Sequence, residues 1–203
     1  WKFNVNANMA WNKNTIISLP DNGLPNNRQD AFQVYDAAGN MIWVGGKQEG
    51  QSYGDIYGFK AEGIYKSYDE IPGNLKDISS ANNSGRNITL LGPDAWNALS
   101  DAEKKQTNSK YLPIQPGDVK WKDVNGDGVI DNYDKVKLGN SLPKLTGGFN
   151  LNLSWKQLTL STRLDYALGH TLIDNKTPWI MGGAQGTYNT ISLTKDSWTE
   201  DNV

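Results

Sequence analysis

The residues best suited to carry chemistry lie in one twelve-residue segment, 123–134, with the sequence DVNGDGVIDNYD. Its spacing matches an EF-hand-type calcium loop, with a glycine at position 6 for the sharp turn and oxygen donors on either side of it. The predicted ligands are Asp123, Asn125, Asp127, Val129 through its carbonyl, Asp131 and Asp134. Calcium prefers hard oxygen ligands, and carboxylates this close together repel one another without a cation. The segment therefore predicts a calcium ion with a structural role.

Two features of segment 123–134 depart from the EF-hand pattern. Position 12 is Asp134 and not glutamate, which shortens the reach of that ligand. Residues 120–122 and 135–138, on either side, are typical of strands and not of helices. A tight turn held by aspartate and asparagine hydrogen bonds, with no metal, is the alternative.

The composition limits the other kinds of site. The 203 residues include no Cys and one His, which excludes thiolate zinc sites, thiol nucleophiles and multi-histidine metal sites. His170 has no evident nucleophile partner, and the acidic pairs at 69–70 and 200–201 are adjacent in sequence, so nothing sets a catalytic separation between them. We expect no enzyme activity. With 20 Lys and Arg against 22 Asp and Glu, the charge favours no nucleic-acid partner.

Aromatic residues of the middle region form a second group of candidates. Planar rings can stack on sugars or anchor an interface with another protein. The candidates are Tyr53, Tyr57, Phe59, Tyr65, Trp96 and Trp121. The alternative for each of them is that the ring fills a small core.

Three segments alternate strictly between large apolar and polar residues: 1–11, 149–155 and 158–168. The first has Trp, Phe, Val, Ala, Met and Trp at its odd positions, with Lys2, asparagines and Ala10 at its even ones. Such a period predicts strands with one apolar and one polar face. Since only Lys156 and Gln157 separate the last two segments, they should form a tight antiparallel hairpin.

This alternation suits either a soluble sheet or a transmembrane barrel. The polar faces are rich in Asn, Ser and Thr, and aromatic residues stand at the strand ends, as in a barrel with interfacial girdles. Ten residue steps span roughly 33 Å, or about 25 Å of membrane depth at a typical barrel tilt. No run approaches the ~18 apolar residues of a transmembrane helix. The pattern favours a barrel.

Residues 12–148 have a different character, with many Asn, Gly, Pro and Asp and short strand-like runs at 31–35, 41–44 and 56–65. Ser100 and Glu103 form a capping box that predicts one helix ending near Thr107, with a short turn at 94–99 before it. So long a stretch should fold on its own as a cap. The expected fold class is mainly β: antiparallel strands of a transmembrane β-barrel fragment plus a mixed, loop-rich extracellular cap with one short helix.

Barrel topology assigns these parts to sides of the membrane. Short turns of outer-membrane barrels are periplasmic and long loops are extracellular. The predicted order is therefore a barrel strand at 1–11, an extracellular cap at 12–148, a barrel hairpin at 149–168 with its turn in the periplasm, and the start of the next extracellular loop at 169–203.

Four segments resemble SusC/RagA-type TonB-linked outer-membrane transporters of Bacteroidetes. They are 50–65 (GQSYGDIYGFKAEGIY), 116–131 (PGDVKWKDVNGDGVID), 139–150 (GNSLPKLTGGFN) and 195–202 (KDSWTEDN). The resemblance implies a barrel of about 22 strands with an N-terminal plug, import of oligosaccharides or peptides driven by TonB, and a SusD-like lipoprotein as a lid. It covers a late part of the barrel, so the plug and the TonB-contacting segment would lie outside these residues.

The predicted function is part of such a nutrient importer in the Gram-negative outer membrane, with the cap contacting the SusD-like lid and the strands contacting the lipid bilayer. The alternative is a secreted, calcium-stabilised β-sheet carbohydrate-binding module. That alternative requires the apolar strand faces to be buried within the chain itself.

Overall fold

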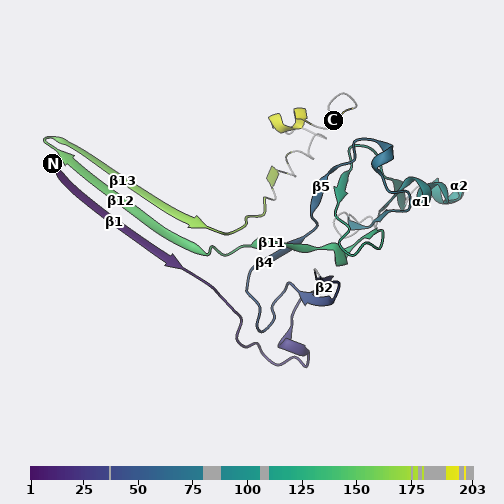
Figure 1. Cartoon of the computed structure of the whole chain (residues 1–203), viewed down its shortest axis with the longest axis horizontal. Coiled ribbons are helices and arrows are strands. Elements are labelled where there is room, and N and C mark those ends of the chain that lie inside the picture. The colour runs from purple at the N-terminus through teal and green to yellow at the C-terminus, as the bar shows by residue number, and fades with distance from the viewer. Residues whose placement is uncertain are drawn as a thin grey trace. The chain divides into compact units, whose positions relative to one another are not determined.

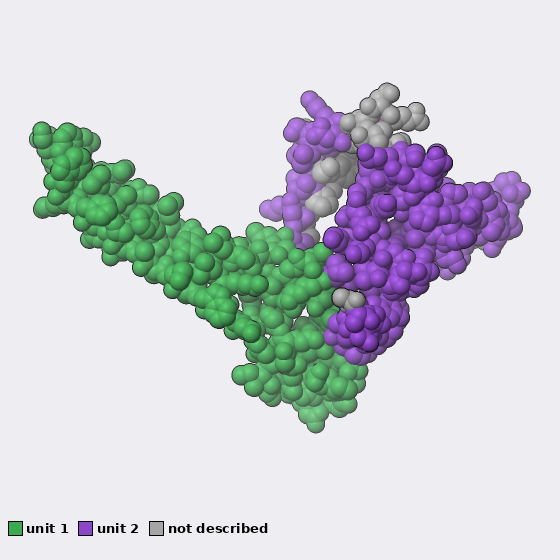
Figure 2. All heavy atoms as spheres, viewed as in Figure 1, with its two compact units in different colours: residues 1–31, 44–57, 137–172 green, residues 32–43, 58–136, 173–203 purple. Residues whose placement is uncertain are grey.

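The structure is a computed structural model of the chain, and it describes residues 1–36, 38–79, 88–105, 110–174, 176–177, 180, 191–196 and 199. The chain divides into two compact units, shown in different colours in Figure 2. Unit 1 comprises residues 1–31, 44–57 and 137–172, and unit 2 comprises residues 32–43, 58–136 and 173–203. None of the described helices has the length and apolar character needed to span a membrane.

A three-stranded antiparallel sheet dominates unit 1 (Figure 1). Its strands are β1 (Lys2–Trp11), β12 (Leu145–Trp155) and β13 (Leu158–Leu168), in the order β1-β12-β13. The predicted strands and hairpin are confirmed, and Lys156 in the turn has a φ of 53°. β12 begins at Leu145, earlier than expected, because Gly147 and Gly148 interrupt the alternation of side chains without interrupting the pairing.

The register of the sheet aligns the apolar rows of all three strands. Phe3 pairs with Leu153, which in turn pairs with Leu160, and the same holds for the polar positions, such as Asn4, Asn152 and Ser161. Directly opposite residues project from the same face, so one face is apolar except at Thr162 and Gly147, and the other is mainly polar.

The apolar face of this sheet is open. Trp1 is 81% exposed, Met9 72% and Leu158 68%. The soluble-module alternative requires these rows to be buried within the chain. Nothing in the described part of the chain buries them. An exposed apolar face of this size indicates contact with a protein or a membrane that lies outside the described residues.

Aromatic residues mark both ends of the apolar face. At the hairpin end, the Trp1 and Trp155 rings stack with centroids 5.2 Å apart, and Lys156 Nζ lies 5.1 Å from the Trp155 ring centre. At the other end, Trp11 closes β1 and Tyr166 stands near the end of β13. Aromatic bands at the two ends of an apolar strip are typical of strands that cross a bilayer.

The ring of Tyr166 lies over Gly147 of the neighbouring strand, with its hydroxyl donating to the Asn8 carbonyl at 3.5 Å. A Cβ at Gly147 would lie 2.6 Å from Tyr166 Cζ and would also collide with the Asn8 carbonyl. We expect Gly147→Ala to lower the unfolding free energy of the protein by about 1–3 kcal/mol through overpacking. Urea unfolding followed by gel mobility measures this.

The matched control for that substitution is the neighbouring residue, Gly148. A Cβ at Gly148 would lie 2.9 Å from Oδ1 of the exposed Asp165 carboxylate, which can rotate away. Gly148→Ala should therefore destabilise the protein less than Gly147→Ala. Equal losses for the two variants would contradict the role assigned to the Tyr166 ring.

The rest of unit 1 joins the sheet ends to a second, short pair of strands. β4 (Asp55–Gly58) pairs with β11 (Val136–Asn140), and a 3-10 turn, η1 (Pro25–Asn27), lies in the segment that follows β1. The strand predicted at 56–65 is in fact two strands, β4 and β5 (Ala61–Ile64). They pair with different partners, because β5 forms a bulged antiparallel pair with β9 (Val119–Trp121).

Unit 2 contains short strands in three sheets. β2 (Phe32–Tyr35) pairs with β3 (Met41–Val44), and β5 pairs with β9. The four-stranded sheet has the order β10-β6-β7-β8, with bounds Val129–Ile130, Lys76–Asp77, Thr89–Leu91 and Tyr111–Pro113. In this sheet β10 runs parallel to β6 and β7 parallel to β8, so the fold is mainly but not wholly antiparallel.

Unit 2 contains the short helices α1 and α2, where the sequence predicted one short helix in this part of the chain. α2 (Asp101–Lys104) begins at the expected capping box, in which Ser100 N donates to Glu103 Oε2 at 2.9 Å and Glu103 N donates to Ser100 Oγ at 3.3 Å. α1 (Pro93–Asn97) forms where only a turn was expected, because Pro93 at its first position presets the helical φ. Thr107 lies outside the described residues.

Short 3-10 turns and a small core also belong to unit 2. Among the turns are η2 (Tyr68–Glu70), η4 (Asn132–Asp134) and η5 (Ser192–Asp196). The core consists of Tyr65, Ile71, Leu75, Ile114 and Ile130, with Phe59, Leu90 and Trp121 packed against it. Ile130 stands inside the predicted calcium loop, so the loop is anchored to the core of the unit.

Candidate functional site

The loop at 123–134 curls around the carboxylate of Asp123. Gly126 N donates to Asp123 Oδ1 at 2.6 Å, and Gly128 N donates to Asp123 Oδ2 at 2.9 Å. Gly128 has a φ of 78°, the left-handed conformation expected for the glycine at position 6. Asn125 and Asp127 bond to each other at the tip, where Asp127 is exposed.

The C-terminal end of the loop has a role that the spacing did not reveal. Asp134 is fully buried, and its two oxygens accept hydrogen bonds from Val124 N and Asp131 N, each at 2.8 Å. Asp131 in turn accepts from Tyr133 N at 2.7 Å, so Asp131 and Asp134 form a capping box around η4. The signal was present as D-x-x-D, the acidic counterpart of the box at Ser100 and Glu103.

The charge of Asp134 is costly in this setting. Burial raises the pKa of its carboxyl, and the nearby carboxylates of Asp123 and Asp131 raise the pKa further, although the two backbone N–H donors lower it. A bound cation would relieve this repulsion.

The loop offers calcium the right kind of atoms. The ladder between β10 and β6 uses the carbonyls of Gly128 and Ile130, which accept from Lys76 N and Ile78 N at 3.0 Å each. Since successive carbonyls of a strand alternate in direction, the Val129 carbonyl faces away from β6. Across the described residues, however, no three acidic or histidine side chains are grouped so that they could hold a metal ion. For calcium to bind, the partly buried Asn125 side chain and the exposed Asp127 side chain would have to turn toward Asp123.

The aromatic candidates are distributed over both units. Tyr53 and Tyr57 belong to unit 1, and the other four belong to unit 2. Tyr65 is only 3% exposed and lies in the core, while Phe59 and Trp121 pack against that core with centroids 5.9 Å apart. Trp96 lies under Lys104 Nζ, 5.6 Å from the ring centre. Tyr53, 50% exposed, has the open face that stacking on a ligand needs.

The remaining candidate residues show no catalytic grouping within the described chain. His170 is partly buried, and its Nδ1 has no hydrogen-bond partner among the described residues. Asp69 and Glu70 are exposed in η2, where Glu70 accepts a hydrogen bond from Lys66 N. Residues 197–198 and 200–203, and with them most of the last resembling segment, 195–202, lie outside the described residues.

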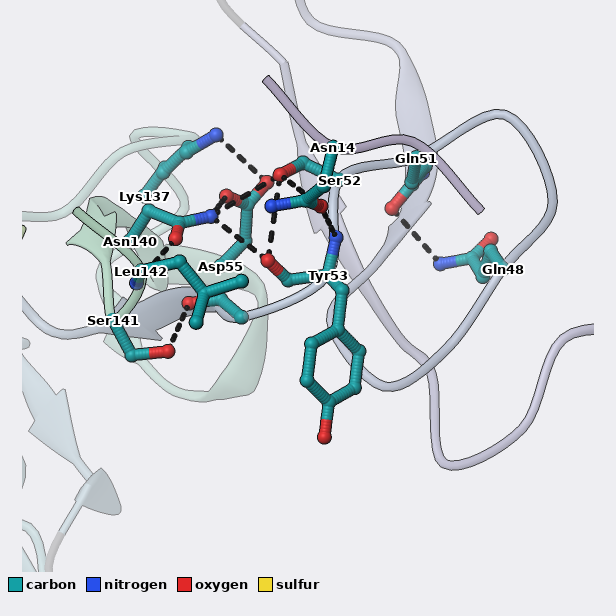
Figure 3. Close-up of polar contacts among 11 residues, drawn as sticks. Asn14, Gln48, Gln51, Ser52, Tyr53, Asp55, Lys137, Asn140, Ser141 and Leu142 are labelled. Atoms are coloured by element: carbon teal, nitrogen blue, oxygen red, sulfur yellow. Dashed lines mark hydrogen bonds and ion pairs between the residues drawn. The ribbon is translucent and has the colours of Figure 1, made fainter. Parts of the chain in front are cut away.

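A polar network in unit 1, which the sequence analysis did not foresee, connects three distant parts of the chain (Figure 3). Asn140 Nδ2 donates to Asp55 Oδ1 at 2.7 Å, to the Tyr53 carbonyl at 3.1 Å and to Ser52 Oγ at 3.2 Å. Asn14 Oδ1 accepts from Tyr53 N at 2.7 Å and from Ser52 Oγ at 3.1 Å. Lys137 Nζ pairs with Asp55 Oδ2 at 2.7 Å.

This network forms one wall of a cavity of about 550 Å³, a volume within the range of ligand pockets. The remaining wall comes from residues just beyond the ends of the long strands, such as Asn12, Lys13, Lys144 and Thr171. No local signal could have predicted the site, because its partners are some 85 residues apart in sequence.

Comparisons with known proteins identify relatives of this chain, although no family model matches it. It is 30% identical to TonB-dependent receptor P39 of Formosa agariphila over 172 residues, which are 81% of this chain and 14% of that protein. It is 23% identical to TonB-dependent receptor P3 of the same organism over 198 residues, 97% of this chain and 16% of that protein. The chain is homologous to part of a TonB-dependent receptor.

TonB-dependent receptors are transporters of the outer membrane and not enzymes, which agrees with the expectation of no catalytic activity. The chain spans about one seventh of the length of the two receptors. Barrel strands of outer-membrane proteins present an apolar face to lipid, and the β1-β12-β13 sheet has an open apolar face.

Proposed function

We propose that this chain forms three neighbouring barrel strands and an extracellular cap of a SusC-like importer of oligosaccharides or peptides. The observation that carries the proposal is the register of β1, β12 and β13, which aligns every apolar row on one face and leaves that face exposed. Homology to TonB-dependent receptors supports the transporter class. Energy from TonB would reach the pore through parts of the protein other than these residues.

The cap, predicted at 12–148 and bounded by β1 and β12 at residues 12–144, is proposed to contact a SusD-like lipoprotein on the extracellular face. The hairpin turn at Lys156 and Gln157 is short, whereas the excursion between β1 and β12 is long, and this asymmetry supports an extracellular position for the cap. Exposed aromatic and apolar side chains of the cap, such as Tyr53 and Met41, are suited to an interface.

The sheet itself suggests how to remove the cap cleanly. Trp11 lies opposite Leu145 in the register, so residues 12–144 can be replaced by a short Asn-Gly type turn that closes β1 and β12 as a hairpin. We expect this variant of the intact protein to insert into the outer membrane but to lose co-purification with its lipoprotein partner. Heat-modifiable mobility on gels verifies insertion, and undiminished co-purification would count against the proposed role of the cap.

We also propose that the loop at 123–134 binds calcium and that the ion stiffens the cap. Three observations support this proposal: the six oxygen ligands in the loop, the turn at Gly128, and the repulsion of the buried Asp134 by the carboxylates of Asp123 and Asp131. Calcium would have a structural role only, because all of its ligands would come from the one segment 123–134 and would hold the turn of that segment closed.

Calcium at ten times its dissociation constant should slow amide exchange in this loop of the intact protein about tenfold relative to a chelator, whereas magnesium should not. Hydrogen–deuterium exchange of residues 123–134 measures the effect. Asp123→Asn should abolish the response. Asp118→Asn is the matched control, because Asp118 accepts a similar backbone bond, from Gln115 N at 2.8 Å, outside the loop. A calcium response that survives in Asp123→Asn would exclude the proposed ligand set.

A further inference from the structure

The cavity of unit 1 carries a surplus of positive charge. Lys13, Lys137 and Lys144 line it, and Asp55 is the carboxylate among its lining residues. Asp55 is already paired with Lys137. In the described part of the chain, Lys13 and Lys144 form no ion pair, so the cavity has a formal charge of about +2 although the whole chain has −2.

The cavity is also continuous with the polar face of the sheet. Asn12 N donates to the Lys144 carbonyl at 2.9 Å, so the antiparallel pairing of β1 with β12 extends one residue beyond the strand ends. By the alternation along β1, Asn12 stands on the face that carries Asn8, opposite the apolar row. Asn12 therefore links this polar face to the cavity, which it lines together with Lys144.

The wall behind the two lysines is fixed in place. The three donor contacts of Asn140 and the ion pair of Lys137 hold that side of the cavity. Thr171 N donates to the Asn140 carbonyl at 2.7 Å, and its side chain packs on Gly139, where even a Cβ would collide with it. Such a preorganised wall costs little entropy when a ligand is ordered against it.

From this arrangement we propose that the cavity binds an acidic saccharide, with its carboxylate or sulfate group between Lys13 and Lys144. Ammonium groups make short, charge-assisted hydrogen bonds to such anions. The amide of Asn12 and the hydroxyl of Thr171, which line the same cavity, are suited to the neighbouring sugar hydroxyls. The inference deepens the proposed import function and rests on it for the route by which the solute arrives.

The test measures solute binding to the intact protein, purified from outer membranes in detergent, by calorimetry. The probes are an oligogalacturonate, a sulfated galactose oligosaccharide of similar length and a neutral galactose oligosaccharide. We expect one or both acidic probes to bind at least about tenfold more tightly than the neutral one, with a preference that weakens as salt is raised. Comparing the two acidic probes tells carboxylate from sulfate recognition.

Variants then locate the site. Lys13→Gln and Lys144→Gln should each weaken binding of the acidic probe about tenfold or more and leave neutral binding unchanged. Lys47→Gln is the matched control, since Lys47 is an exposed lysine of unit 1 that does not line the cavity. Equal binding of neutral and acidic probes, stronger binding of an acidic peptide than of any saccharide, or acidic binding unaffected by both variants would overturn the inference.

Uptake separates this inference from the function on which it rests. Cells that import neutral oligosaccharides through the intact protein with no preference for acidic ones would disprove the acidic site and leave the importer standing. Cells in which deleting the protein changes the uptake of no oligosaccharide or peptide would instead refute the proposed function.

Discussion

Replacing Leu151 by arginine is expected to destabilise the membrane-inserted protein by about 2–4 kcal/mol, the cost of a basic side chain at the lipid midplane of a barrel. Leu151 is at the centre of β12, between Val5 of β1 and Thr162 of β13, and it projects from the apolar face. On that face the guanidinium would have to leave water for acyl chains, without a partner in the neighbouring strands.

The adjacent residue supplies the control for Leu151→Arg. Asn152 is at nearly the same depth but projects from the polar face, between Asn4 and Ser161. Asn152→Arg should insert almost normally. Urea unfolding in lipid vesicles and the folded fraction in outer membranes compare the two variants. If both arginines are tolerated equally, the apolar face does not contact lipid, and the barrel assignment loses its physical basis.

Removing the carboxylate of Asp134 should loosen the loop at 123–134 by about 2–4 kcal/mol, because two buried N–H groups lose a charged acceptor. Asp134→Ala leaves Val124 N and Asp131 N without their bonds of 2.8 Å and opens a void in a fully buried position. Asp134→Asn keeps one carbonyl acceptor and should cost about half as much. Amide exchange at Val124 and Asp131 in the intact protein reports the effect locally.

Asn132→Ala tests whether the effect is specific to Asp134. Asn132 belongs to the same 3-10 turn, η4, but its side chain is exposed. It should change exchange at Val124 and Asp131 little. A loop that stays equally protected in Asp134→Ala would mean that the core contact of Ile130, rather than the carboxylate, holds the segment.

Strand positions and faces could be predicted because the alternation is written in consecutive residues. Segments 1–11 and 158–168 carry their apolar groups at every second position, and the strands follow them closely. The capping box at Ser100 is equally local, since its two partners are three residues apart. Gly128 likewise adopts the conformation that its place in the loop requires.

Other features depended on partners far along the chain. Asn8 Oδ1 accepts from Gly148 N, 140 residues away, at 2.5 Å, and this contact belongs to a register that no local pattern contains. The parallel pairs β10–β6 and β7–β8 were not foreseen, because strands of two or three residues are too short to show a period. The burial of Tyr65 could not be predicted either, because its core neighbours are distant in sequence. Tyr65 was a candidate for ligand contact and lies in the core.

By itself, then, the sequence determined which segments are two-faced strands, that the acidic loop turns at Gly128 and which family the chain resembles. Each of these signals is carried by neighbouring residues. Only the tertiary structure decided that the apolar rows of three strands join into a single open face. It also decided that Lys13, Asp55, Lys137 and Lys144 share a cavity and that Asp134 is a buried cap. Burial and pairing are properties of contacts between distant residues, and such contacts exist only once the chain has folded.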